Sequence, residues 1–233
     1  MDHLGSIDTD SAQLARIAVE VGGQTRIPSC PDWTMLELVQ HLGEVHEFWA
    51  HVIEAADPEA AWEGERASPP GTLDDAVVWM RSQTRRMLDV MSAHDPSSAC
   101  WTWWGEPRTS GAVRRHQVQE AALHRWDAEG STGSVPAISR EVALDGIPEW
   151  IEVRLPWMTS LPRPIVVFHT TDAPGSWILP SHDPQCDVRV SVTGSASDLV
   201  LFLNGRQTLE SLTVTGDALL LAPLVSEMAA LNS

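Results

Sequence analysis

The sequence predicts an α+β protein with two domains, a four-helix bundle followed by a small mixed domain, and three observations support this. The first half contains four segments in which apolar residues recur at helical spacing. A Gly/Ser-rich segment, residues 130–139, then interrupts that pattern. Beyond it, short apolar runs are typical of strands. The chain has 233 residues and 43% hydrophobic content, which is enough for two domains that each bury a core.

Start signals support the helices of the first half. We expect helices over residues 10–21, 34–56, 72–93 and 110–129. Thr34 and Glu37 have the spacing of a capping box, in which each side chain bonds a backbone N–H that the helix leaves unpaired. Thr72 and Asp75 repeat this arrangement. Four helices of this length are typical of a four-helix bundle, so we place this domain at residues 1–130.

The second half changes from helical to mixed periodicity. We expect strands over residues 165–170, 187–192 and 211–214, and helices over residues 195–203 and 218–231. The segment DVRVSV alternates cleanly between polar and apolar side chains, as a half-buried strand does. We therefore place an α+β domain at residues 140–233.

Charge excludes two classes of function. The formal net charge is −17 and the sequence pI is about 4.7. Such a chain repels a phosphate backbone unless its cations cluster, and the sequence contains no basic stripe. We therefore expect no nucleic-acid partner, and no affinity for an anionic membrane surface. No apolar run is long enough for a membrane-spanning helix.

The cysteines and the N-terminal residues predict a cytoplasmic location. Cys30, Cys100 and Cys186 are odd in number and far apart, without a CxxC or zinc-knuckle spacing. Reduced thiols of this kind are typical of a cytoplasm. The first residues carry acids where a secretory signal has Lys or Arg, and no apolar segment follows them.

One constellation on the fourth expected helix could bind a metal. His116, Glu120 and His124 follow each other at four-residue intervals and share one stripe of the helix. Glu120 and His124 could reach a common zinc ion, which accepts oxygen and nitrogen ligands. A third ligand could come from His41, on the apolar face of the second helix. Spacing alone leaves other interpretations open: His41 as a hydrogen-bonded core histidine, and Glu120 with His124 as a solvated pair.

The motifs resemble those of a known family. PSCPDWTMLELVQHLGEVHEFW is similar to the opening of the mycothiol-dependent maleylpyruvate isomerase family, and RRHQVQEAALHRWDAEG resembles the segment of that family with the Glu and His ligands. The C-terminal segments LDGIPEW, HTTDAPGSWIL, VTGSASDLVLFLNGR and VTGD extend the resemblance over nearly the whole chain.

The resemblance implies a DinB-like metal-binding bundle followed by a sterol-carrier-protein-like domain. It places the metal ligands at His41, Glu120 and His124, and it implies a divalent metal, zinc or else nickel. Three protein ligands leave one coordination position open, as in catalytic zinc sites. In this family that position is thought to receive mycothiol, the low-molecular-weight thiol of actinobacteria, as a bound thiolate.

The resemblance further implies an enzyme, either an isomerase of the maleylpyruvate type or a mycothiol S-transferase. Its partners would be a small-molecule thiol and an electrophilic substrate. Addition of the thiolate to an activated double bond, rotation and elimination would isomerise the substrate, whereas retention of the thioether would give transfer. The alternative is a non-catalytic protein that binds a metal or a small molecule on the same fold.

The sequence defines the roles of four further residues less clearly. The resemblance gives Arg206 a catalytic and cofactor-binding role toward an anionic thiol or substrate; an ordinary arginine at a helix C-terminus is the other interpretation. Asp127 could accept a hydrogen bond from a ligand imidazole or pair with an arginine. Asp32 and Gln119 depart from the family's usual Gly and His, which leaves the substrate undefined.

Overall fold

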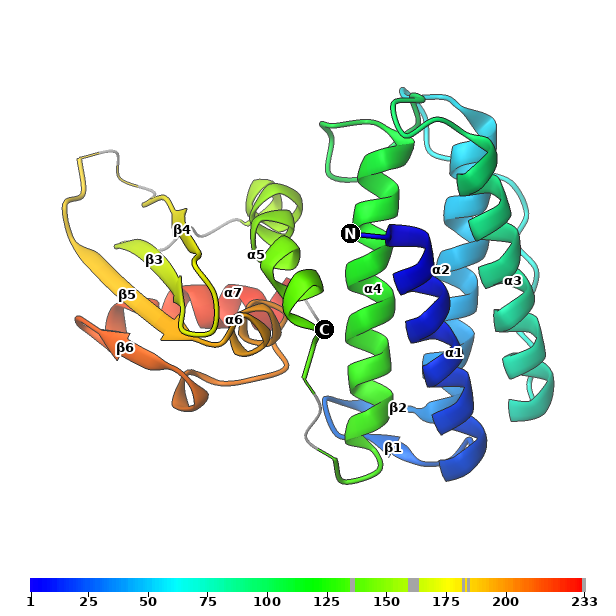
Figure 1. The fold of residues 1–233 in the computed structure, drawn as a ribbon, viewed down its shortest axis with the longest axis horizontal. Helices are drawn as coiled ribbons and strands as arrows, with labels where there is room; N and C mark the ends of the chain where they lie inside the picture. Colours follow the sequence, from blue (N-terminus) through cyan, green and yellow to red (C-terminus); the bar gives the residue numbers. More distant parts are fainter. Residues whose placement is uncertain (135–136, 159–163, 182, 184, 232–233) are drawn as a thin grey trace. The chain divides into compact units, whose positions relative to one another are not determined.

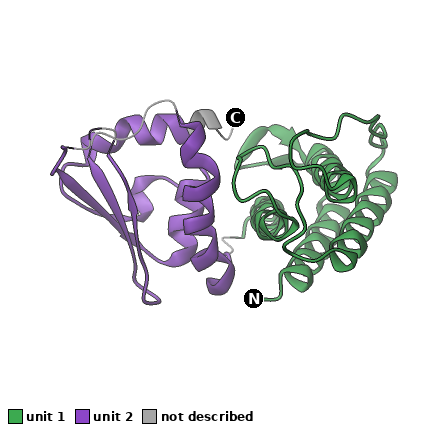
Figure 2. Cartoon of the chain, turned by 90° about the horizontal axis from the view of Figure 1, so that it is seen from above, with its two compact units in different colours: residues 1–136 green, residues 137–233 purple. Residues whose placement is uncertain are grey.

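The computed structural model describes residues 1–134, 137–158, 164–181, 183 and 185–231. Contacts divide the chain into two compact units, Met1–Pro136 and Ala137–Ser233 (Figure 2). The first contains long helices and the second a four-stranded sheet with helices. This confirms the predicted fold class, a helical N-terminal region followed by a small sheet-containing region.

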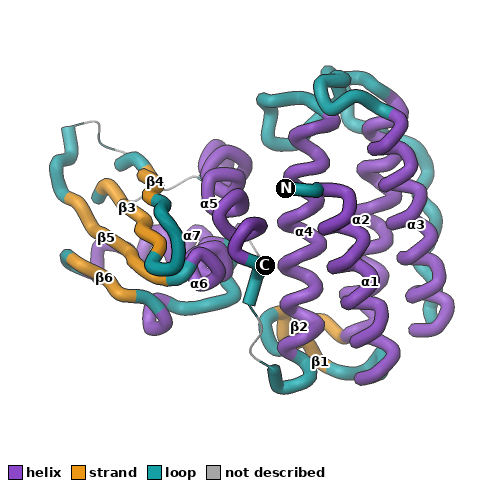
Figure 3. The backbone as a smooth tube through the Cα atoms, viewed as in Figure 1, coloured by secondary structure: helices purple, strands orange, loops and turns teal. Residues whose placement is uncertain are grey.

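Unit 1 is built on four helices that run side by side (Figures 1 and 3). They are α1 (His3–Val21), α2 (Met35–Ala55), α3 (Leu73–Ala93) and α4 (Ser110–Gly130). Helix α2 packs on α3, and α1 packs on both α4 and α3. The apolar stripes read from the sequence are largely buried, with Leu14, Leu38 and Met80 fully inaccessible.

The predicted caps form at the helix starts. The Thr34 hydroxyl accepts a hydrogen bond from the Glu37 amide, and the Glu37 carboxylate accepts one from the Thr34 amide. Thr72 accepts from the amide of Asp75 in the same way. Helix α1 instead begins at His3, earlier than the expected residue 10, because Asp2 caps it by accepting from the Gly5 amide.

A short hairpin in unit 1 was not predicted. Strands β1 (Arg26–Ile27) and β2 (Cys30–Thr34) pair antiparallel. They lie at one end of the bundle (Figure 3). The hairpin leads directly into α2, so it positions the turn before the helix that carries His41.

Unit 2 is a mixed sheet covered by helices on one side, as Figure 2 shows. The strands are β3 (Ile165–Thr170), β4 (Ser176–Leu179), β5 (Arg189–Gly194) and β6 (Thr213–Thr215), in the order β4-β3-β5-β6. Strands β3 and β5 run parallel, and the other pairs are antiparallel. Alternate side chains are buried, among them Val166 and Phe168 of β3 and Val190 and Val192 of β5.

The helices of unit 2 are α5 (Arg140–Arg154), α6 (Ala196–Leu203) and α7 (Ala222–Leu231). Helix α5 packs against α6, and α6 contacts β3 and β5. Three short 3-10 turns, Leu155–Trp157, Leu209–Ser211 and Ala218–Leu221, complete the described elements.

The structure differs from the expectations for unit 2 at several elements. Helix α5 was missed, because Gly146 and Pro148 interrupt a pattern whose buried residues, Ala143, Ile147 and Trp150, do recur at helical spacing. Strand β4 was missed because its four residues are too few for a clear period. The strand expected over residues 187–192 spans Arg189–Gly194, and the one expected over residues 211–214 spans Thr213–Thr215.

Candidate metal centre

Three partly or fully buried side chains from two helices of unit 1 meet in one place. The Nε2 atoms of His41 on α2 and His124 on α4 each lie 3.1 Å from Oε1 of Glu120. Glu120 and His124 are one turn apart on α4, so both project from the same stripe. The three potential ligand atoms lie within 4.8 Å of one another, and no other such group of three or more His, Cys, Asp or Glu occurs among the described residues.

The donor set fits a zinc ion. A tetrahedral zinc with bonds of about 2.0–2.2 Å keeps its ligand atoms about 3.3 Å apart. The two His–Glu distances of 3.1 Å are close to this value, and the three ligand atoms together lie within the wider limit of 4.8 Å. Two imidazoles and one carboxylate are also the ligand types of several catalytic zinc sites.

A hydrogen-bond chain behind His124 fixes its orientation. Its Nδ1 lies 3.0 Å from Oδ2 of Asp127, a fully buried residue. The other carboxylate oxygen of Asp127 accepts a 2.6 Å hydrogen bond from the Ser29 hydroxyl, in the turn between β1 and β2. The contact with the imidazole, one of the two possibilities named for Asp127, is therefore present. A carboxylate behind a metal-binding histidine holds the ring in place and raises its basicity.

The charges in the cluster favour an ionised Glu120 beside a protonated His124. Burial would raise the pKa of Glu120, but the adjacent His124 and His41 outweigh it and hold that pKa well below 4.5. Burial would likewise lower the pKa of His124, but Glu120 and Asp127 raise it from 6.5 to about 9. The metal-free cluster therefore contains an ionised Glu120 and an imidazolium at His124, and a metal binding at neutral pH must displace that proton.

An aromatic side chain lies against both histidines. The ring of Trp33, in β2, lies 4.8 Å from that of His41 and 6.1 Å from that of His124, measured between centroids. Sequence reasoning did not assign a role to Trp33 or Ser29, although both belong to the PSCPDWT motif region. Their role could have been suspected from the sequence, because this motif directly precedes the helix that carries His41.

The other histidines and Cys30 occupy different surroundings. His46 is fully buried, and its Nδ1 lies 2.9 Å from the Thr84 hydroxyl. Burial lowers the pKa of His46 to about 3, so it is neutral at physiological pH. His116 is buried beside the ring of Trp104, at 4.9 Å between centroids, and not at the surface. Cys30 is partly buried and packs against the apolar core.

Arg206 belongs to unit 2 and follows α6. Its backbone N–H donates to the carbonyl of Leu201, and its guanidinium donates to the carbonyl of Asn204, each at 2.8 Å. Gly205 just before it adopts a φ of 69°, a conformation that favours glycine at a helix end. This geometry holds the backbone of Arg206, and the role of its side chain stays a proposal.

Two family models match most of the chain. The mycothiol maleylpyruvate isomerase N-terminal domain matches residues 4–129, and the MDMPI C-terminal domain matches residues 141–223. The chain belongs to the mycothiol-dependent maleylpyruvate isomerase family. This confirms the resemblance read from the sequence motifs. No curated protein sequence matches the chain.

Two solved structures share the fold of this family member. One is the mycothiol-dependent maleylpyruvate isomerase, with a TM-score of 0.63 and 13% identity over 93% of each chain. The other is a histidine-to-alanine mutant of the mycothiol-dependent maleylpyruvate isomerase, with a TM-score of 0.64 and 14% identity over 93% of each chain. At these identities the likeness shows the fold alone. None of the described helices is both long and apolar enough to cross a membrane.

Proposed function

We propose that this chain is a metal-dependent enzyme that uses mycothiol against a small electrophile, as a maleylpyruvate-type isomerase or a mycothiol S-transferase. The observation that carries the proposal is the convergence of His41, Glu120 and His124, with ligand atoms within 4.8 Å of one another. Membership of the mycothiol maleylpyruvate isomerase family over both domains supports the choice of thiol.

The chain's own side chains would hold the metal. Glu120 contributes a negative charge, and His41 and His124 contribute imidazole nitrogens, which suits zinc, with nickel as the other candidate. A bound divalent cation would stabilise the thiolate form of mycothiol, which is the nucleophilic form of a thiol. Three protein ligands are the number typical of a catalytic site.

Neighbouring residues would keep the ligands in place. Asp127 holds the Nδ1 side of His124, so that its Nε2 faces the cluster. The Trp33 ring lies against both imidazoles and restricts their movement. In unit 2, we propose that Arg206 binds an anionic group of the thiol or substrate, since a guanidinium pairs well with a carboxylate.

Turnover tests the proposal. The zinc-loaded protein is incubated with mycothiol and a panel of electrophiles that includes maleylpyruvate, and the products are analysed by mass and by isomer. An isomer of unchanged mass indicates an isomerase, and a mycothiol conjugate indicates a transferase. A Glu120→Gln variant provides the control. If the zinc-loaded protein converts none of these compounds, the alternative of a non-catalytic metal-binding protein is supported instead.

A further inference from the structure

Arg81 and Arg85 differ from the other arginines of unit 1 in their contacts. The chain contains 32 acidic and 15 basic residues, all of the latter arginine, so acidic partners are plentiful. Among the described residues of unit 1, every arginine has a hydrogen bond, an ion pair or an aromatic contact except Arg81 and Arg85. These two lie one turn apart on α3, so they share one stripe of the helix.

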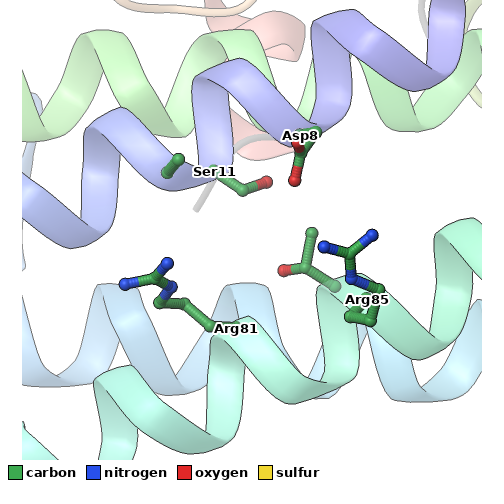
Figure 4. A pocket seen from close by; sticks show the side chains of 6 residues that line it. Asp8, Ser11, Arg81 and Arg85 are labelled. Carbon is green, nitrogen blue, oxygen red and sulfur yellow. The ribbon is translucent and has the colours of Figure 1, made fainter.

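Both arginines line a pocket between α1 and α3. Its volume is about 170 Å³, several times that of a water molecule, so it can hold a small ligand. Asp8, Ser11 and Ala12 line it from α1, and Arg81, Thr84 and Arg85 line it from α3. Figure 4 shows Asp8 and Arg85 pointing toward each other across the gap, but no ion pair joins them.

A buried hydroxyl in the same pocket has no partner. Ser11 is 2% exposed, and its Oγ makes no hydrogen bond. Figure 4 shows this hydroxyl directed into the gap between the helices. The Thr84 hydroxyl, in contrast, donates to the Met80 carbonyl and lies 2.9 Å from Nδ1 of His46. Buried polar groups are normally satisfied, so the unpaired Ser11 Oγ is free to bond a ligand in the pocket.

We propose that this pocket binds a small oxyanion, held by the guanidinium groups of Arg81 and Arg85 and by the Ser11 hydroxyl. Oxyanions match the forked donors of arginine, and such charge-assisted hydrogen bonds are the strong ones. The Ser11 hydroxyl would donate to the same ligand. Asp8 offsets one of the two positive charges, so the pocket favours an anion of low charge. The site is separate from the His41–Glu120–His124 cluster.

Titration with inorganic phosphate tests the proposal. The full-length protein is titrated by calorimetry at constant ionic strength, set with sodium chloride. We expect saturable binding that weakens about tenfold or more in an Arg81→Gln/Arg85→Gln variant, because charge-assisted hydrogen bonds are lost. Asp8→Asn should tighten binding, since it removes a negative charge from the pocket. Ser11→Ala should weaken it to a smaller degree.

Two controls locate the binding. Arg16→Gln changes an arginine on α1 that already pairs with Glu20, and it should leave phosphate binding unchanged. A His41→Ala/Glu120→Ala/His124→Ala variant should also bind phosphate normally, so failure of the metal proposal would not affect this one. Absence of saturable binding, or equal affinity in the wild type and the double arginine variant, would overturn the proposal.

Discussion

The imidazole of His124 lies between two carboxylates, with Nδ1 at 3.0 Å from Asp127 and Nε2 at 3.1 Å from Glu120. Glu120 also contacts His41, whereas Asp127 is bonded on its far side by Ser29. Asp127 therefore holds the ring at Nδ1, the nitrogen that does not contact Glu120. Asp127 is thus one of the contacts that orient His124.

Replacing Asp127 should weaken metal binding although every ligand remains. Asp127→Asn removes the charge that holds Nδ1, and such changes typically lower metal affinity by about 10-fold to 100-fold. Competition with a chelator measures the affinity. Asp10→Asn, which changes an acid that pairs with Arg125 instead, is the matched control. Equal affinities of Asp127→Asn and wild type would show that the contact does not support the metal site.

Metal affinity should rise with pH. The pKa of His124 is raised to about 9 in the metal-free protein, so below that pH a metal must displace a proton from it. We expect the affinity for zinc to increase by about tenfold per pH unit between roughly pH 7 and 9, and to level off above. Chelator competition across this range provides the measurement. A flat profile would exclude His124 as a ligand that loses a proton.

His124 should also make the metal-free protein less stable as the pH rises. The pKa of His124 rises from 6.5 to about 9 on folding. Its stabilising contribution is therefore complete below about pH 6.5 and is lost as the pH rises through 9. Urea unfolding at several pH values, with His124→Gln for comparison, measures this. If the two proteins show the same loss of stability over this interval, another group is responsible.

The helical framework was largely predictable, because it follows from local patterns. Apolar spacing and the caps at Thr34 and Thr72 define three of the four bundle helices to within a few residues. The α1 start depended on Asp2, which precedes the apolar stripe. Helix α5 was hidden by Gly146 and Pro148, whose effect on a helix depends on the packing around it.

The candidate site was only partly predictable from spacing. The four-residue interval places Glu120 and His124 together on any α-helix, but it does not indicate which residue approaches from another helix. The position of His41 on the apolar face of the second helix made it one possible third ligand, the family resemblance selected it, and the structure brings it to Glu120. Trp33 and Ser29 reach the site through the β1–β2 hairpin, whose fold-back against α4 depends on tertiary packing that local patterns do not specify.

Acid should destabilise the protein partly through His46. The pKa of His46 falls from 6.5 to about 3 because the side chain is buried, so the unfolded chain binds a proton that the folded one does not. Stability should therefore decline by roughly 1.4 kcal/mol per pH unit from this residue as pH falls from about 6.5 toward 3. A His46→Gln variant, unfolded by urea at each pH, should show a shallower decline. An unchanged decline would contradict this assignment.

Arg206 and His124 should have distinguishable effects on catalysis. Arg206→Ala should raise the concentration of thiol or substrate needed for half-maximal rate and leave the metal content intact. His124→Ala should abolish both metal binding and turnover, because a thiol without the cation is mostly protonated at neutral pH. Arg189→Ala, on β5 of the same unit, is the matched control for the first variant. Loss of metal from Arg206→Ala would instead assign that residue a structural role.

Metal content tests the central claim most directly. The purified protein is loaded with zinc, dialysed and subjected to elemental analysis, together with a His41→Ala/Glu120→Ala/His124→Ala variant shown to be folded. A His51→Ala/Glu54→Ala variant, which removes another His–Glu pair on α2, serves as the control. We predict about one zinc per chain in the wild type and the control, as for a site with three protein ligands, and none in the triple variant. Full zinc content in the triple variant would contradict the assignment of His41, Glu120 and His124 as the metal ligands.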